Sequence, residues 1–420
     1  MQQKREKIEP KDVATAQLHE KWSRLPASLV AHAASWIGDA RSLAALESAC
    51  QAWSAAANAK LNILWKALYL YEWEAISAND PSVAIDGAET SWKKRFAART
   101  RIDRNWATGK YRRSMIEVDL SAPDGPMLAI VNSPPLLLCA TFDIPVTVFS
   151  LPECKELRQL GTIHSSETLN VDESQSPPLA ALCNEQTASV WNVEAAAQVG
   201  KTISFSSACI AVASYGNRLA ALLANNTFGM FDFQSGEQIF ALSLPLECHR
   251  LHWSSDGQWL LADYFPRLAQ HLLLIDTRPA TPVVTSLQPS VGDYLVDKSP
   301  SLRGDVVVLS KTHASRRRPS DSAFSQICAY DSSAFVHLAG TMVDRHRVLL
   351  FSEDSTRVVL DFRNGTLREL PKSTAVAVAS ATSFRFAAAL LEFDHDDEDE
   401  GDDEDFREET RGLLVLDFGV

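Results

Sequence analysis

The amino-acid sequence predicts a mainly β protein: a seven-bladed β-propeller preceded by a small all-α domain. Three observations predict it, namely a change of hydrophobic period near residue 113, a strand unit that recurs after this point, and the spacing of those units. With 420 residues the chain exceeds the usual size of one domain. We therefore expect either two domains or a domain built from repeats.

The two parts of the chain differ in period. Up to about Arg113 the sequence is rich in Ala, Leu, Lys and Trp, and apolar residues recur at intervals of three and four, as in helices. From Ser114 onward, short runs of β-formers are separated by Asp-Gly, Ser-Gly, Asn-Gly and Pro. The basic, turn-like stretch from Asn105 to Arg113 is the expected boundary. The predicted parts are a flexible N-terminus at 1–22, a helical domain at 23–72, a helical linker at 73–113 and the propeller at 114–420.

A strand that ends in an aromatic or aliphatic residue followed by Asp, or by a near substitute, recurs seven times after the boundary. The seven units are Val146–Leu151, Ser189–Val193, Gly229–Phe233, Leu273–Thr277, Ile327–Asp331, Val358–Phe362 and Leu413–Phe418. The first four lie about 40 to 45 residues apart, which is the period of four-stranded propeller blades. The pattern resembles the WD-repeat family in degenerate form, without a Trp-Asp or Gly-His pair. Eight blades or a pair of β-sandwiches are the alternatives.

The last unit needs a fourth strand from elsewhere, because only Gly419 and Val420 follow its Asp-Phe pair. The segment Ser114–Leu120 is a strand without a partner in the first unit. We expect it to complete the last blade and so remove two exposed strand edges.

The stretch from Leu25 to Trp53 opens with Leu-Pro, continues as an amphipathic helix, and carries Leu, Leu, Cys and Trp after an Asp-containing turn. This order resembles the F-box, a helical motif that docks on a Skp-type adaptor and through it on a cullin. The four late positions are three or four residues apart, so they form one apolar stripe. The resemblance assigns adaptor binding to Leu25, Pro26, Leu29, Ile37, Leu43, Leu46, Cys50, Trp53 and Trp65. The alternative is an ordinary pair of core helices.

A second segment supports the same resemblance. Residues Ser91 to Arg113 are similar to the linker of F-box proteins with WD repeats, in which a Trp-bearing helix leads into an Asn-Trp-x-x-Gly turn. Here that turn consists of Asn105, Trp106 and Gly109.

Two insertions are expected between the second and third strands of their blades, on the face that receives substrate in such proteins. One is Lys311–Phe324 in the fifth unit, and the other is the acidic run at 392–409 in the seventh. Guanidinium groups pair bidentately with phosphate and carboxylate. The candidate substrate-binding residues are therefore Arg316, Arg317 and Arg318, with Lys311 beside them and Arg267 in the fourth unit. A basic localisation patch and, for the acidic run, a solvated loop are the alternatives.

The net charge of −13 is concentrated in the acidic run, since residues 394–409 contribute −11 and the rest of the chain only −2. A nearly neutral body does not predict nucleic-acid binding. The seven cysteines are scattered and lack zinc-ligand spacing, and no catalytic motif or cofactor signature is present. The sequence therefore predicts no enzyme, no metal and no cofactor. No apolar run is long enough to span a bilayer and the first residues are too polar for a signal peptide, so we expect a cytoplasmic or nuclear protein without membrane contact.

These expectations combine into a functional hypothesis. The chain would be the substrate-receptor subunit of a cullin-based ubiquitin ligase, with a Skp-type adaptor on the helical domain and a protein substrate, acidic or phosphorylated in one reading, on the propeller. The alternative is a WD-repeat scaffold that binds proteins without being part of a ligase.

Overall fold

The chain divides into two compact units, Met1–Thr100 and Arg101–Val420. The computed structural model describes residues 41–42, 44–45, 63–69, 91–117, 127–132, 134–141, 143–163, 169–254, 256–263, 272–279, 281–287, 294–295, 305–310, 312–331, 337–344, 346–352, 357–370, 379–380, 386–392 and 411–418.

The described residues of the first unit are helical. They comprise short pieces at 41–42 and 44–45, a segment at 63–69, and the first half of helix α5 (Trp92–Thr108). Two edge-on aromatic pairs join the segment 63–69 to α5. The ring centroids of Trp65 and Phe96 are 5.2 Å apart, and those of Tyr69 and Trp92 are 5.6 Å apart.

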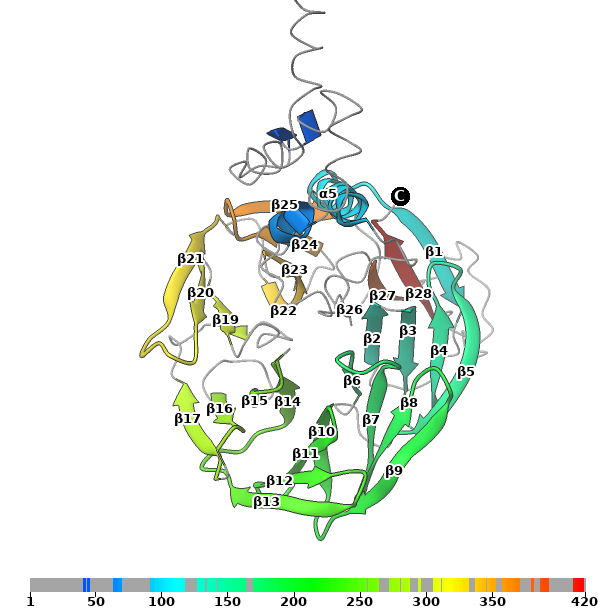
Figure 1. The fold of residues 1–420 in the computed structure, drawn as a ribbon, viewed down its shortest axis with the longest axis vertical. Helices are drawn as coiled ribbons and strands as arrows, with labels where there is room; N and C mark the ends of the chain where they lie inside the picture. Colours follow the sequence, from blue (N-terminus) through cyan, green and yellow to red (C-terminus); the bar gives the residue numbers. More distant parts are fainter. Residues whose placement is uncertain are drawn as a thin grey trace, which may run out of the picture. The chain divides into compact units, whose positions relative to one another are not determined.

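In the second unit the described strands form seven four-stranded sheets, which follow one another around a ring (Figure 1). In order from the inner to the outer strand, the sheets are β2 (Met127–Asn132), β3 (Pro135–Ala140), β4 (Pro145–Ser150), β5 (Lys155–Thr162); β6 (Asn170–Asp172), β7 (Leu179–Asn184), β8 (Thr187–Asn192), β9 (Ala197–Ser204); β10 (Cys209–Tyr215), β11 (Arg218–Leu223), β12 (Thr227–Asp232), β13 (Glu237–Ser243); β14 (Arg250–Trp253), β15 (Trp259–Asp263), β16 (Leu272–Asp276), β17 (Val283–Leu287); β18 (Tyr294–Leu295), β19 (Val306–Leu309), β20 (His313–Arg317), β21 (Ser325–Ala329); β22 (His337–Asp344), β23 (Arg347–Ser352), β24 (Arg357–Asp361), β25 (Thr366–Leu370); and β26 (Ala379–Ser380), β27 (Phe386–Glu392), β28 (Arg411–Asp417), β1 (Arg112–Glu117).

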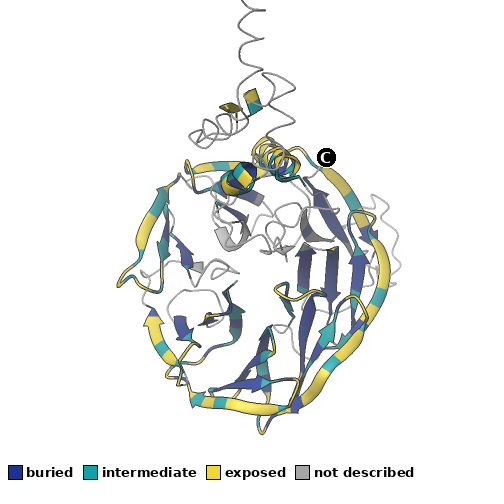
Figure 2. Cartoon of the chain, viewed as in Figure 1, coloured by how far each residue is buried: buried dark blue, intermediate teal, exposed yellow. Residues whose placement is uncertain are grey.

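The mainly β propeller predicted from the sequence is thus confirmed. Neighbouring strands are antiparallel throughout. Burial falls from the middle strands to the outer ones (Figure 2). In the first sheet, five of the six residues of β3 are buried, whereas β5 is mostly exposed or half-buried. The fifth and seventh sheets have the shortest inner strands, since β18 and β26 are two residues long.

The recurring Asp or Asn ends the third strand of a sheet and shapes the turn that follows. The third strands β8, β12, β16 and β24 end in Asn192, Asp232, Asp276 and Asp361, and each side chain accepts a hydrogen bond from the backbone N–H two residues later, at 2.9 to 3.0 Å. Such a bond stabilises a tight turn between two antiparallel strands. The repeat therefore has a structural cause in four sheets.

The fifth sheet does not follow this pattern, and its predicted phase was wrong. The unit Ile327–Asp331 belongs to the fourth strand, β21, whereas the third strand is β20, His313–Arg317. Since β20 ends in two arginines, the sequence offered no Asx residue to mark it. The segment Lys311–Phe324 is consequently no insertion between the second and third strands.

This change of phase moves the arginines to the other face of the ring. Antiparallel strands place the turn between the third and fourth strands at the opposite edge from the connection between the second and third. Residues 318–324 form the former in the fifth sheet, and the acidic run 392–409 joins β27 to β28, the second and third strands of the seventh. The expectation that Lys311–Phe324 leaves its blade from the same position as the acidic run was therefore wrong. The acidic run itself lies outside the described residues.

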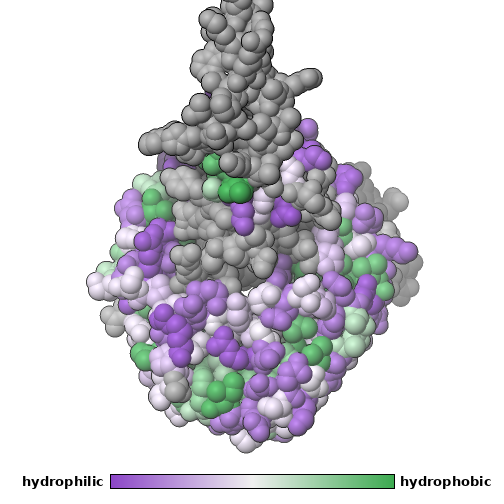
Figure 3. Space-filling view, in the orientation of Figure 1, coloured by the Kyte–Doolittle hydropathy of each residue, from purple (hydrophilic) through white to green (hydrophobic). Residues whose placement is uncertain are grey.

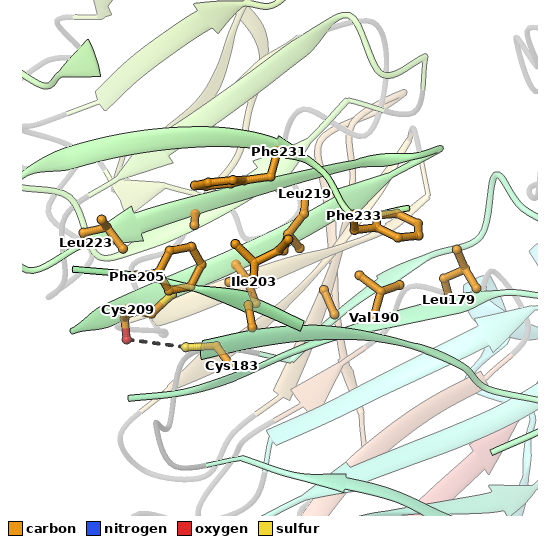
Figure 4. Close-up of a cluster of buried hydrophobic side chains, with 14 residues drawn as sticks. Leu179, Cys183, Val190, Ile203, Phe205, Cys209, Leu219, Leu223, Phe231 and Phe233 are labelled. Carbon is orange, nitrogen blue, oxygen red and sulfur yellow. Dashed lines mark hydrogen bonds between the residues drawn. The ribbon is translucent and has the colours of Figure 1, made fainter. Parts of the chain in front are cut away.

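The core lies between neighbouring sheets. One cluster, between the second and third sheets, contains Leu179, Cys183, Ile203, Phe205 and Phe233 among its members, all under 9% exposed (Figure 4). Further clusters join the first sheet to the second, the third to the fourth, the fourth to the fifth, the fifth to the sixth, and the seventh to the first. The first five sheets thus bury both of their faces against their neighbours.

Strand β1 closes the ring, as expected. It pairs with β28 over six residues, from Arg112 opposite Asp417 to Glu117 opposite Gly412. The strand begins two residues before the predicted Ser114. The predicted turn-like boundary needs correction as well, because α5 continues to Thr108 and includes Asn105 and Trp106.

The closure predicts how the protein tolerates truncation. A chain that begins at residue 122 lacks β1 and leaves β28 as an open edge, so it should aggregate, whereas a chain that begins at residue 104 should stay soluble. Size-exclusion chromatography with light scattering measures the difference. Equal solubility of the two chains would contradict the role of β1.

Candidate interaction surface

The end of α5 is anchored to the last strand of the propeller. Trp106 is fully buried and stacks on Phe418 with ring centroids 3.6 Å apart and an angle of 12° between the planes. The Asn105 side-chain amide donates to the Phe418 carbonyl at 2.8 Å, also in a buried position. Two of the three residues of the predicted Asn-Trp-x-x-Gly junction therefore hold the closing segment in place.

Three further contacts complete this junction. Gly109 ends the helix, and its φ of +63° is a left-handed conformation that glycine adopts at little cost. The N–H of Lys110 then donates to the Asn105 carbonyl at 2.9 Å. Arg347, from the sixth sheet, pairs with Asp103 at 2.5 Å. Arg368, also from the sixth sheet, donates to the carbonyl of Ala107.

Of the nine predicted adaptor residues, the structure describes one. Trp65 lies on the helical segment 63–69, is 4% exposed and contacts Phe96 within the first unit. It therefore has a packing role inside its own unit. The other eight, Leu25, Pro26, Leu29, Ile37, Leu43, Leu46, Cys50 and Trp53, lie outside the described residues, and their adaptor role stays a prediction.

The three predicted substrate-binding arginines make contacts within the fifth sheet, two of them in the turn between β20 and β21. Arg316 pairs with Asp305 at 3.7 Å, and Arg317 donates through Nε to the Asp321 carbonyl at 3.1 Å. The backbone N–H of Arg318 donates to the Asp321 carboxylate at 3.2 Å, while its side chain is exposed. These contacts favour a structural role for Arg316 and Arg317. Lys311 and Arg267 lie outside the described residues, so the substrate role of the set stays a prediction.

A polar and aromatic cluster joins the second, third and fourth sheets. Asp172 accepts from the N–H of Gly216 at 2.8 Å, and burial raises the pKa of its carboxyl. Arg218 lies over the Trp253 ring at 4.8 Å and donates to the Gly257 carbonyl at 2.6 Å. Asp172 and Arg218 each form a hydrogen bond with the backbone of the next sheet, so the cluster holds neighbouring blades together rather than forming a ligand site.

The described residues show no arrangement typical of a catalytic site or a metal site. The Ser310 hydroxyl lies 2.7 Å from His313 Nδ1, but it also accepts from the N–H groups of Thr312 and His313, so it belongs to the turn between β19 and β20. Within the described parts of the chain, no three His, Cys, Asp or Glu side chains are placed to hold a metal ion. No helix there is both long and apolar enough to cross a bilayer.

The thiols of the described residues are free and mostly buried. Burial raises the pKa of Cys139 and of Cys248 to about 12. A hydrogen bond with Cys183, together with burial, raises the pKa of Cys209 as well. The Cys183 thiol donates to the Cys209 carbonyl at 3.4 Å (Figure 4). Since the thiolate is the reactive form, these cysteines are poor nucleophiles.

Sequence reasoning noted the basic stretch from Asn105 to Arg113 as a boundary but assigned no binding role to the cations at the end of α5. Arg101, Arg104 and Lys110 are exposed, and the exposed Arg112 pairs with Asp417 at 3.2 Å. The net charge of the whole chain does not reveal this local excess of Lys and Arg, whereas the net charge of short sequence windows does. On the described part of the face in Figure 3, apolar residues occur in small separate groups among hydrophilic ones, so recognition there would depend on polar contacts.

Comparison with known proteins supports the fold. No family model matches the chain, so no F-box is shown, and no curated protein matches either. Among solved structures, the β-propeller domain of Cps50 (Swd1) from Myceliophteria thermophila is similar with a TM-score of 0.53 and 14% identity, covering 73% of this chain and 99% of that one. U3-55K is similar with a TM-score of 0.51 and 10% identity, covering 73% of this chain and 98% of that one. These similarities, at 14% and 10% identity, support the β-propeller fold.

The junction predicts a loss of stability when its tryptophan is removed. Replacing Trp106 by Ala deletes the ring that stacks on Phe418 and should lower the free energy of unfolding of the propeller by about 3 to 5 kcal/mol. Urea unfolding followed by circular dichroism measures it. Trp92→Ala, on the same helix but in the first unit, is the matched control and should leave the propeller transition in place. An equal effect of both changes would refute the anchoring role.

The burial of the thiols predicts the order in which the cysteines are alkylated. In the folded protein at pH 8, Cys154 and Cys328, which are partly exposed, should react with iodoacetamide before Cys139 and Cys248, whose protonated, buried thiols are protected. Mass spectrometry of peptides after timed labelling gives the order, and labelling in urea provides the control in which the difference disappears. Early labelling of Cys139 would contradict the burial in the first sheet.

Proposed function

We propose that this chain is the substrate-receptor subunit of a cullin-based ubiquitin ligase, in which residues 25–53 bind a Skp-type adaptor and the propeller recruits a protein substrate. The observation that carries the proposal is the junction of Asn105, Trp106 and Gly109. The same three residues that resemble the linker of F-box proteins with WD repeats lie where α5 meets β28, and two of them make buried contacts there.

Two further observations support it. The propeller fold is typical of proteins that recruit other proteins, and its similarity to solved propellers extends over 73% of the chain. The order Leu-Pro, amphipathic helix, Asp turn, Leu, Leu, Cys and Trp precedes the propeller in the sequence, as in F-box receptors. A ligase subunit of this kind would work in the cytoplasm or nucleus, without catalytic residues or a cofactor of its own, and without contact with nucleic acid or membrane.

One observation favours the second candidate, a scaffold that binds proteins outside any ligase. Trp65, which the resemblance assigns to the adaptor contact, is 4% exposed and packs on Phe96. A side chain that is buried within its own unit contributes no area to a partner. The two candidates therefore differ in whether an adaptor binds.

Adaptor binding is tested by the double change Pro26→Ala, Leu29→Ala. It should abolish co-purification of a Skp-type adaptor and its cullin in affinity purification followed by mass spectrometry, because both residues lie in the segment predicted to dock. The control is Pro10→Ala, Leu18→Ala, which removes the same residue types before the F-box-like segment. Recovery of the adaptor with the first variant as with the parent would reject the ligase proposal and leave the scaffold.

A further inference from the structure

The segment that links the two units is the most basic stretch of the chain. Residues 92–113 contain nine Lys or Arg and one Asp, a local charge of +8, while the rest of the chain carries −21. The part that belongs to the propeller unit, 101–113, contains five of the cations and the one acid. The charges of this protein are therefore segregated rather than mixed.

The acid in this segment is already engaged. Asp103 pairs with Arg347 at 2.5 Å, and both side chains are largely buried. Arg112 uses Asp417 on the neighbouring strand. Arg101, Arg104 and Lys110 are exposed, and within the described residues no ion pair involves them. We call these three residues, with Arg113 on β1, the basic edge.

The fold itself does not require these cations. The buried side of α5 carries Ile102, Asn105 and Trp106, and the last two make the anchoring contacts. Arg101 and Arg104 are three residues apart, so they lie on one side of the helix and repel each other, which costs the helix a few tenths of a kcal/mol at most. Because these exposed cations have no ion pair among the described residues, they are available to the anionic groups of another molecule.

The charge pattern selects the kind of molecule. Beyond a Debye length of roughly 8 Å at physiological salt, only the summed charge of a larger region matters. The described residues of the propeller unit that follow Arg113 carry a net negative charge. A long polyanion such as duplex DNA or an anionic membrane would meet this repulsion. A short acidic segment would contact the basic edge alone, and three of the four cations are arginines, whose planar fork fits carboxylate and phosphate oxygens.

We propose that the basic edge, Arg101, Arg104, Lys110 and Arg113, is a docking surface for a short acidic segment of a partner protein, with carboxylates or phosphates as its anionic groups. The proposal concerns the propeller unit only and does not depend on the ligase function.

The experiment is fluorescence anisotropy with the full chain and three labelled probes: an oligoglutamate peptide, a phosphoserine peptide of the same length, and a DNA duplex. The test variant is Arg101→Ser, Arg104→Ser, Lys110→Ser. The matched control is Lys155→Ser, Arg158→Ser, Lys201→Ser, which removes the same number of cations from the outer strands β5 and β9. Urea midpoints equal to that of the parent show that both variants are folded.

The parent should bind at least one of the peptides, and the test variant should bind it about tenfold more weakly, as expected for the loss of three exposed charge pairs. The control variant should bind like the parent, and added salt should reduce the difference. Tighter binding of the phosphoserine peptide would identify phosphate as the anion, and tighter binding of oligoglutamate would identify carboxylate. The proposal is overturned if neither peptide binds the parent, if the test variant binds as well as the parent, if the control loses as much affinity, or if the DNA duplex binds more tightly than both peptides.

Discussion

The pairing of β1 with β28 is the constraint on which the rest of the propeller depends. It joins residues about 300 positions apart, as the hydrogen bond from Asn105 to Phe418 shows with a separation of 313. Every other sheet is built from strands that follow one another along the chain. The entropy of closing a long loop grows only with the logarithm of its length, so the cost of this one distant contact is modest once the sheets have formed. Without it, the first and last sheets would both lose a neighbour.

The tertiary packing explains why the ring needs this closure. The cluster between the seventh sheet and the first contains Ile116 from β1, Leu128 from β2 and Leu413 from β28, each buried. These side chains come from both ends of the propeller sequence, and none is buried by its own sheet alone. The anchoring of Trp106 on Phe418 then fixes the start of β1 against the end of β28. Backbone pairing and side-chain burial thus depend on each other at a single place.

The repeat was readable from the sequence because a physical requirement repeats. Asp232 and Asp276 each hold the turn after their strand by a bond to the backbone, so the residue type recurs even where the Trp of a WD pair is absent. In the fifth sheet the turn is held differently, through Arg317 and the Asp321 carbonyl. Asp331, which the repeat pattern assigns to the end of the third strand, follows the fourth strand β21 instead. The pattern therefore fails in the fifth sheet, where Arg317 rather than an Asp or Asn ends the third strand.

The candidate site was less predictable than the fold. The closing strand could be predicted because an unpaired edge is costly in any sheet, whatever its sequence. A surface for a partner has no such general rule, and the basic stretch beside the anchor could be recognised in the sequence as a boundary but not as a binding surface.

In the propeller unit, one side of α5 packs in the closure of the ring and the other side is available to a partner, so partner binding and ring closure are thermodynamically linked. Its buried side, with Asn105 and Trp106, belongs to the closure of the ring, whereas its exposed side carries Arg101 and Arg104. A partner that binds the exposed side recognises residues whose spacing exists only while the helix is formed and docked. Binding to the folded state alone stabilises that state by mass action, in proportion to the logarithm of partner concentration over its dissociation constant. Binding of a partner at the basic edge and closure of the propeller would therefore stabilise each other, although the partner would not contact Asn105 or Trp106.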